Sequence, residues 1–274
     1  MKYVSIGAIV GDIAGSRFEF NNHKSKDFEL LADNCYITDD SILTVATMQA
    51  LLNGGTAEAF TDAYQSFGRE YTFTTDLTGK KYGAGYGSKF FNWLISKDPR
   101  PYGSFGNGAP MRVSPVAWFY DTLDDVERAA ETSASVTHNH PEGIKGAKSV
   151  AAAIFLARTG KDKPFIKEYI ERTYGYNLDF TLDEIRDTYE HSEACQDTVP
   201  QAIVAFLEGE SFEDVIRNAV SIGGDSDTIA AMAGAIAEGF YGAPYQLRST
   251  ITQYIPHQLI DVMDEFSSSV NAGL

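Results

Sequence analysis

The stretch GGDSDTIAAMAGAIAEGF at residues 223–240 predicts an apolar helix that begins beside a cluster of carboxylates. From Ile229 to Phe240 apolar residues recur at helical spacing, and Gly242 follows at a position where helices commonly end. Asp225 and Asp227 come just before this helix, directly after a pair of glycines. The stretch therefore places acidic groups at the start of an apolar helix.

Helical spacing extends over most of the remaining chain. Further helices are predicted at residues 40–52, 126–136, 144–156, 199–207, 212–220 and 255–266. Thr181 and Glu184 form a capping box, which predicts one more helix start. The best strand candidate is Tyr71–Thr75, while residues 80–87 and 103–108 are predicted to be glycine-rich loops. We predict an all-α fold in which residues 1–274 form a single compact multi-helix domain.

The composition restricts the setting and the partners of the protein. A net charge of −16 would repel nucleic acid, so no nucleic-acid partner is expected. No apolar run approaches the ~20 residues of a membrane span, and Asp12 and Arg17 interrupt the run that could resemble a signal peptide. Cys35 and Cys195 lack the spacing of a disulfide framework, which favours a reducing cytoplasm. A monomer is the default expectation.

A second acidic cluster, Thr38-Asp39-Asp40, stands at the start of another predicted helix. Helix capping would explain a single aspartate at such a position. Two clusters, each with paired carboxylates and a threonine hydroxyl, also suit a hard cation with oxygen ligands, Mg²⁺ or Mn²⁺. The spacing alone leaves capping and metal binding open.

A third acidic element is GDIAGSRFE at residues 11–19. Gly11 and Gly15 would permit close approach of another backbone. Asp12 and Glu19 are seven residues apart, so within one helix they would share a face. Asp12 could equally be a buried capping carboxylate, and Glu19 an ordinary surface residue.

Two further segments contain candidate binding groups. The loop Gly103–Gly108 precedes a predicted helix start near Met111 and could hold a phosphate. The ring of Phe105 could stack on a base or sugar, or simply pack. The segment Thr137-His138-Asn139-His140 lacks the partners of a zinc site, so its histidines are expected to form loop hydrogen bonds.

Together these elements resemble the ADP-ribosylglycohydrolase family, which includes dinitrogen-reductase-activating glycohydrolases and ADP-ribosyl-acceptor hydrolases. The resemblance spans nearly the whole chain. Its five ordered elements are GDIAGSRFE at 11–19, TDDS at 38–41, GSFGNGAPMR at 103–112, TH at 137–138 and GGDSDT at 223–228. The chain departs slightly from the family pattern, since Ser41 stands where many members have threonine.

The resemblance implies an all-α domain that hydrolyses the glycosidic bond between ADP-ribose and an acceptor. The substrate would be an ADP-ribosylated protein or a small-molecule conjugate of ADP-ribose. Two divalent cations, Mg²⁺ or Mn²⁺, would be held between the two acidic clusters. The implied metal ligands are Thr38, Asp39, Asp40, Asp225, Asp227 and Thr228.

The resemblance also implies residues for catalysis and for substrate binding. Glu19, Asp39 and Asp227 are the predicted catalytic residues, with Glu19 favoured for proton transfer because it need not be a permanent ligand. The predicted substrate-binding residues are Gly85, Gly87, Gly103, Ser104, Phe105, Asn107 and His138. The acceptor side shows no clear motif, so arginine, serine, O-acetyl-ADP-ribose and other acceptors stay open. The resemblance favours an arginine-linked acceptor, because bacterial-looking members of the family often act there.

Two other functions are weighed against this one. The chain could be an inactive, ADP-ribose-binding member of the family, although it retains every ligand-type residue. It could also be a Mg²⁺-dependent phosphohydrolase that uses Asp225 and Asp227 as nucleophile and acid. That chemistry needs a strand before the motif, whereas residues 212–220 have a helical pattern.

Overall fold

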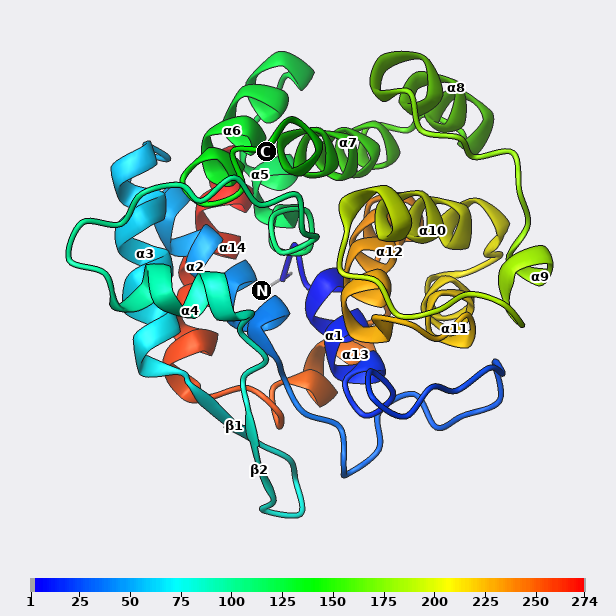
Figure 1. The fold of residues 1–274 in the computed structure, drawn as a ribbon, viewed down its shortest axis with the longest axis horizontal. Coiled ribbons are helices and arrows are strands. Elements are labelled where there is room, and N and C mark those ends of the chain that lie inside the picture. Colours follow the sequence, from blue (N-terminus) through cyan, green and yellow to red (C-terminus); the bar gives the residue numbers. More distant parts are fainter. Residues whose placement is uncertain (1–2, 274) are drawn as a thin grey trace.

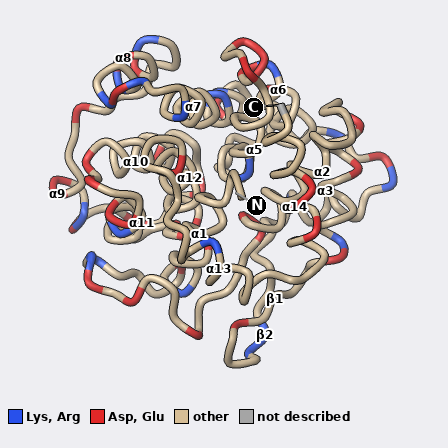
Figure 2. Tube along the Cα trace, turned by 180° about the vertical axis from the view of Figure 1, so that it is seen from behind, with Lys and Arg blue, Asp and Glu red and all other residues tan. Residues whose placement is uncertain are grey.

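Two helices from opposite ends of the chain lie against each other at the centre of the computed structural model, which describes residues 3–273. Helix α1 (Gly7–Gly15) is buried along its whole length, and helix α12 (Ser226–Tyr241) is buried from Ser226 to Glu238. They are neighbours in both views of the chain (Figures 1 and 2). The start of α12 and the end of α1 are thereby brought together.

Glycines make this contact close. A Cβ atom added at Gly11 would lie 2.0 Å from the carbonyl oxygen of Ala230, and one at Gly15 would lie 2.5 Å from the Cα of Asp227. The two backbones therefore touch directly, as the sequence had suggested for Gly11 and Gly15. The amide of Gly7 also donates to the Glu238 carboxylate at 2.6 Å, which satisfies a free N–H group at the start of α1.

The remaining helices pack around this pair on two sides. Helices α7, α10 and α11 contact α12, whereas α2 contacts α1, α3, α5 and α14 (Figure 1). The other elements are α2 (Asp39–Leu52), α3 (Ala57–Glu70), β1 (Phe73–Thr75), β2 (Lys81–Gly83), α4 (Ser88–Ile95), α5 (Ser114–Phe119), α6 (Leu123–Ser135), α7 (Pro141–Arg158), α8 (Lys163–Tyr174), α9 (Leu182–Ile185), α10 (Cys195–Glu208), α11 (Phe212–Ser221), α13 (Tyr245–Ile251) and α14 (His257–Gly273).

The all-α prediction is confirmed, because the described chain contains fourteen helices and one two-stranded sheet. The predicted capping box is present at the start of α9, where Thr181 and Glu184 bond reciprocally. Helix α1 was missed as a helix. Its glycines have low helix propensity, and its complete burial removes the amphipathic period that normally marks a helix.

The only sheet of the described chain is a short antiparallel hairpin. It pairs Phe73 with Gly83 and Thr75 with Lys81. The strand predicted at Tyr71–Thr75 is present but shorter, since β1 begins at Phe73. The predicted loop at residues 80–87 was wrong in part, because Lys81–Gly83 form strand β2. In the turn, the Asp76 carboxylate accepts hydrogen bonds from Thr78, Lys80 and Tyr82 and so stabilises the hairpin. The alternating pattern of a strand does not report such a turn.

Within the described residues, no helix has both the length and the apolarity needed to cross a bilayer. Cys35 and Cys195 are both buried and free.

We predict that Gly11→Ala lowers the free energy of unfolding by roughly 1–3 kcal/mol, the usual cost of an overpacked core. In the interior of an ordinary helix, replacing glycine by alanine raises the free energy of unfolding, because alanine has the higher helix propensity. Here the new methyl group would meet the Ala230 carbonyl, so the sign reverses. Urea unfolding measures the effect. Gly83→Ala is the matched control, because a Cβ there meets nothing within 4 Å. A Gly11→Ala protein as stable as the original would contradict the close α1–α12 contact.

Candidate active site

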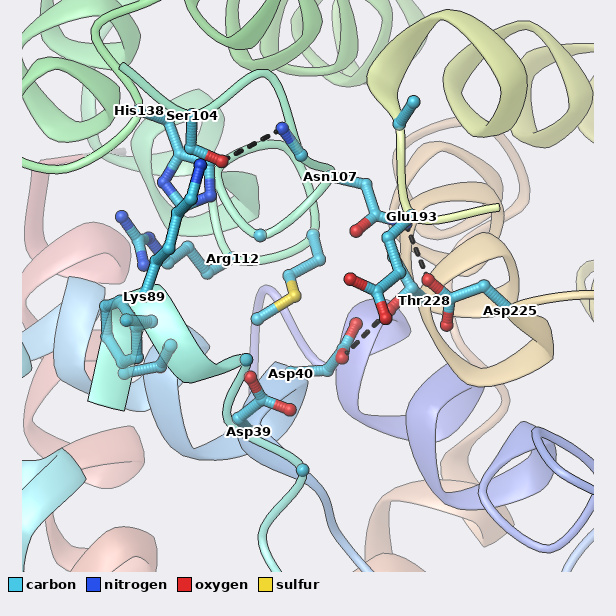
Figure 3. Close-up of a pocket in the computed structure, with 18 of the residues that line it drawn as sticks. Asp39, Asp40, Lys89, Ser104, Asn107, Arg112, His138, Glu193, Asp225 and Thr228 are labelled. Carbon is cyan, nitrogen blue, oxygen red and sulfur yellow. Dashed lines mark hydrogen bonds between the residues drawn. The ribbon is translucent and has the colours of Figure 1, made fainter. Parts of the chain in front are cut away.

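A cavity of about 600 Å³ lies where the two acidic clusters meet. This is within the usual size range of small-molecule sites. Its wall comes from six parts of the chain: Glu19, the start of α2, residues 85 and 87–90, residues 102, 104–108, 111 and 112, His138 with residues 191–194, and the start of α12. Figure 3 shows the carboxylates of Asp39, Asp40 and Asp225 facing this space.

The two clusters are in direct contact although they are far apart in the sequence. The Thr228 hydroxyl donates to Asp40 Oδ2 at 3.1 Å, across 188 positions of the chain. Three carboxylate oxygens lie within 4.8 Å of one another, one each from Glu19, Asp225 and Asp227. The structure thus brings together Asp40, Asp225, Asp227 and Thr228, with Glu19 added to them.

These groups fit a divalent cation. Their donor atoms are oxygens, the kind that Mg²⁺ and Mn²⁺ prefer. Among the described residues, the buried Oδ1 atoms of Asp40 and Asp227 have no hydrogen-bond partner. A buried charged oxygen without a partner is costly, and a cation would remove that cost.

The remaining predicted ligands lie beside this group. Asp39 is half-buried and lines the cavity, with Gly85 so close that an added Cβ would be 2.9 Å from Asp39 Oδ1. Thr38 is buried behind the wall. Its hydroxyl donates to Asp12 at 2.8 Å and lies 3.4 Å from Asp40 Oδ2, so its oxygen faces the cluster only indirectly.

Burial and mutual repulsion raise the pKa values of the carboxyl groups. Burial, followed by the charges of Asp225 and Asp39, raises the pKa of Glu19 to about 8. Burial, followed by Asp12 and Asp225, likewise raises the pKa of Asp39 to about 8. The pKa values of Asp40 and Asp227 are raised well above their usual range, first by burial and then by neighbouring carboxylates. Near neutral pH the cluster therefore binds protons unless cations neutralise it.

Asp12 organises the site from behind. Its buried carboxylate accepts hydrogen bonds from the amides of Thr38 and Ser41, at 2.9 and 3.1 Å, and from both of their hydroxyls. Burial nevertheless raises the pKa of Asp12 to about 6. The alternative that Asp12 is a buried capping carboxylate is therefore confirmed. Its hydrogen bonds to Thr38 and Ser41 hold the first turn of α2 in place.

Asp12 and Glu19 do not belong to one helix, so the condition under which they would share a face is not met. Helix α1 ends at Gly15, and the amide of Phe18 turns back to the Gly15 carbonyl at 2.8 Å. Phe18 is buried against His23 and Phe28, which holds this turn. Glu19 consequently reaches the cavity from a turn and meets α12 instead of continuing α1.

The glycine loop joins the acidic cluster to the opposite wall. Asn107 donates from Nδ2 to Asp225 Oδ2 at 2.7 Å, and its amide donates to the Glu193 carbonyl at 2.8 Å. The helix start predicted near Met111 was wrong. Residues 105–107 pair with 193–195, residues 107–112 then form turns, and α5 begins only at Ser114.

The predicted substrate-binding residues divide into two groups. Six of them line the cavity: Gly85, Gly87, Ser104, Phe105, Asn107 and His138. Gly103 is absent from this lining; it turns the chain at φ +66° and donates to Asn139. The Phe105 ring is half-exposed and meets His140 edge-on, so it is available to a ligand.

Several residues of the cavity wall were not predicted from the sequence. Arg112 is fully buried, and Lys89, His191 and Glu193 line the rim. A lone arginine within the apolar run APMRVSPVA was a detectable signal for Arg112. His191 and Glu193 stand in a polar segment, and Lys89 is a single lysine directly before Phe90. No sequence pattern separates these three from surface residues.

The phosphohydrolase alternative is not supported by the fold. Asp225 and Asp227 follow helix α11, whereas that chemistry requires a preceding strand in a parallel sheet. Within residues 3–273 the only sheet is the β1–β2 hairpin.

The chain is similar to known proteins along most of its length. A sequence profile of the ADP-ribosylglycohydrolase family matches residues 4–269. The chain is 28% identical to the Homo sapiens ADP-ribosylhydrolase ARH3, over 86% of this chain and 84% of that protein. It is 31% identical to the ADP-ribosylarginine hydrolase Tri1 of Pseudomonas putida (strain GB-1), over 55% of this chain and 41% of that protein. A solved structure described as an ADP-ribosylglycohydrolase-related protein complex has the same fold, with a TM-score of 0.67 and 23% identity, and the match covers 97% of this chain and 93% of that chain.

We predict that Asp12→Asn weakens Mg²⁺ or Mn²⁺ binding by ~10–100-fold, as is typical when a group that orients metal ligands is changed. The amide would place N–H donors against the amides and hydroxyls that now donate to Asp12. Isothermal titration calorimetry measures the affinity. Asp76→Asn is the control, because this carboxylate accepts a comparable set of bonds in the hairpin turn. Equal affinities of both variants would remove the proposed role of Asp12.

We also predict that Mg²⁺ raises the melting temperature more at about pH 8.5 than at about pH 6. Glu19 and Asp39 have folded pKa values raised to about 8 from 4.5 and 3.8. A carboxyl group whose pKa is higher in the folded than in the unfolded protein stabilises the fold while it is protonated. This contribution is complete below the unfolded pKa values and is lost as the pH rises through about 8, where the folded carboxyl groups ionise. Cations would offset that loss once the carboxylates are ionised. Melting curves in EDTA and in Mg²⁺ provide the measurement, and a Mg²⁺ effect that shrinks with pH would contradict it.

Proposed function

The chain belongs to the ADP-ribosylglycohydrolase family, and from this premise we propose that it is a metal-dependent hydrolase of ADP-ribose conjugates. It would cleave the N- or O-glycosidic bond between ADP-ribose and an acceptor, releasing ADP-ribose. The observation that carries the proposal is the convergence of Glu19, Asp225 and Asp227 on one side of the cavity, with Asp40 bonded to Thr228 beside them.

Two divalent cations, Mg²⁺ or Mn²⁺, would be held by the six oxygen-bearing residues named from the sequence. Asp40, Asp225, Asp227 and Thr228 are the best placed, Asp39 faces the same cavity, and Thr38 supports Asp40. When bound, the cations would neutralise the carboxylates and orient hydroxyl groups of the sugar. The unpartnered Oδ1 atoms of Asp40 and Asp227 support this assignment.

The protein's own groups provide charge and proton transfer. Cleavage of a glycosidic bond passes through a transition state with positive charge on the sugar ring, which nearby carboxylates stabilise. Asp39 and Asp227 would serve in this way. Glu19, whose pKa is raised to about 8, can hold or release a proton near neutral pH, as a general acid or base must.

An arginine-linked acceptor is the substrate that we favour. Glu19 and Glu193 both line the cavity, and carboxylates attract the cationic guanidinium group of such an acceptor. A similar protein bears the name ADP-ribosylarginine hydrolase, which adds support. We further propose that the protein works as a monomer in the cytoplasm, without a nucleic-acid or membrane partner.

The test is the release of free ADP-ribose from arginine-linked and serine-linked conjugates and from O-acetyl-ADP-ribose, with Mg²⁺, with Mn²⁺ and after chelation. We expect release that EDTA abolishes and added cation restores. Asp227→Ala and Asp39→Ala should each lower turnover by ~10²-fold or more, the scale for loss of an electrostatic catalytic group.

Asp62→Ala, an exposed aspartate of α3, is the control and should keep full activity. Binding of ADP-ribose without release from any conjugate would indicate an inactive member of the family. Turnover that survives thorough chelation would contradict the metal-dependent mechanism.

A further inference from the structure

Arg112 is among the largest side chains that are completely buried in the described part of the chain, and it lines the cavity. Its guanidinium lies 4.0 Å from the centre of the Tyr64 ring, a contact that holds the group in place. Its Nη2 donates to Thr137 Oγ1 at 2.7 Å. A guanidinium has only donors, so the Thr137 oxygen must be the acceptor of this bond.

The Thr137 hydroxyl therefore has one hydrogen left to donate and two acceptors within reach. His138 Nδ1 is 2.7 Å away, and the Ala134 carbonyl oxygen is 3.5 Å away. That carbonyl already accepts from the amides of Thr137 and His138, at 3.1 and 2.7 Å, which uses both of its lone pairs. The hydroxyl hydrogen consequently goes to His138 Nδ1.

A ring nitrogen that accepts a hydrogen bond carries no proton. Burial, together with the charge of Arg112, lowers the pKa of His138 well below its usual range, so the ring is neutral. A neutral imidazole without a proton on Nδ1 carries it on Nε2.

The ring is also fixed in direction. Tyr102 packs edge-on against it, with centroids 5.6 Å apart, and an added Cβ at Gly108 would lie 3.0 Å from Nε2. His138 lines the same cavity as the glycine loop and Arg112 (Figure 3). The Nε2 end therefore lies beside that loop.

We infer that Arg112 and Thr137 are positioning residues that hold His138 as its Nε2–H tautomer, so that His138 offers one fixed hydrogen-bond donor to the bound ligand. The inference rests on the proposed function, because the ligand there is the ADP-ribose part of the substrate. It adds a requirement of its own: the ligand atom that meets His138 is an acceptor, such as a phosphate oxygen, and a ligand N–H group is rejected at that position.

The direct test is the protonation pattern of the ring in the wild-type protein without ligand. Long-range proton–nitrogen correlation spectra of ¹⁵N-labelled protein distinguish Nδ1–H from Nε2–H. The signals of His138, one of five histidines, are assigned with a His138→Phe variant. We expect protonated Nε2 and unprotonated Nδ1. The opposite tautomer, or a mixture of both, would overturn the inference whether or not the protein is active.

Variants test the consequence for binding. Thr137→Val removes the hydroxyl at nearly constant volume, and we expect it to weaken ADP-ribose binding about tenfold, the effect of one lost hydrogen bond. Thr137→Ser retains the hydroxyl and should restore both the tautomer and the affinity. Thr74→Val controls for the loss of a buried threonine, because no partner of the Thr74 hydroxyl is found in the described chain.

The outcomes separate the two proposals. Wild-type protein with the expected tautomer but no release of ADP-ribose from any conjugate would refute the proposed activity and leave the Arg112–Thr137–His138 arrangement intact. Active protein in which Thr137→Val keeps both tautomer and affinity would refute the arrangement and leave the activity intact. If Thr137→Val does not fold, the wild-type spectrum still decides.

Discussion

The direct contact between the backbones of α1 and α12 is the constraint on which the rest of the structure depends. Three glycines, Gly7, Gly11 and Gly15, face α12 at positions where a methyl group would meet backbone atoms within 2.5 Å. Such contacts gain dispersion energy along the buried lengths of the two helices and leave no space for adjustment. They also determine that Asp12 and Asp227, from opposite ends of the chain, lie in one place.

The acidic site is held together against its own electrostatics. Asp39, Asp40, Asp225 and Asp227 repel one another, and burial makes each charge costlier. The surrounding helices provide the free energy that keeps them in position, and Asp12 fixes the start of α2. An apolar core of this extent can support a locally unfavourable cluster, which is the usual condition of a preorganised site.

The cavity is electrostatically divided. Carboxylates occupy the wall formed by the starts of α2 and α12, whereas the cationic Arg112 and Lys89 lie on the other side together with the neutral His138 (Figure 3). Asn107 joins the two sides through its bond to Asp225. Such a division suits a ligand that is anionic at one end and develops positive charge at the other, and it explains how a chain of net charge −16 could bind a diphosphate.

The helical class, both acidic clusters, the glycines that permit close approach and the family resemblance can all be predicted from the sequence, because each is a local pattern of residue types. Packing between distant segments was needed to show that Glu19, in the turn after α1, meets Asp225 and Asp227. It was also needed to show that Asn107 bonds to Asp225 and that Arg112 is linked to His138 through Thr137. Periodicity reports which face of an element is buried. It contains no information on which partner a polar side chain meets after the chain has turned, since that depends on packing between segments distant in the sequence.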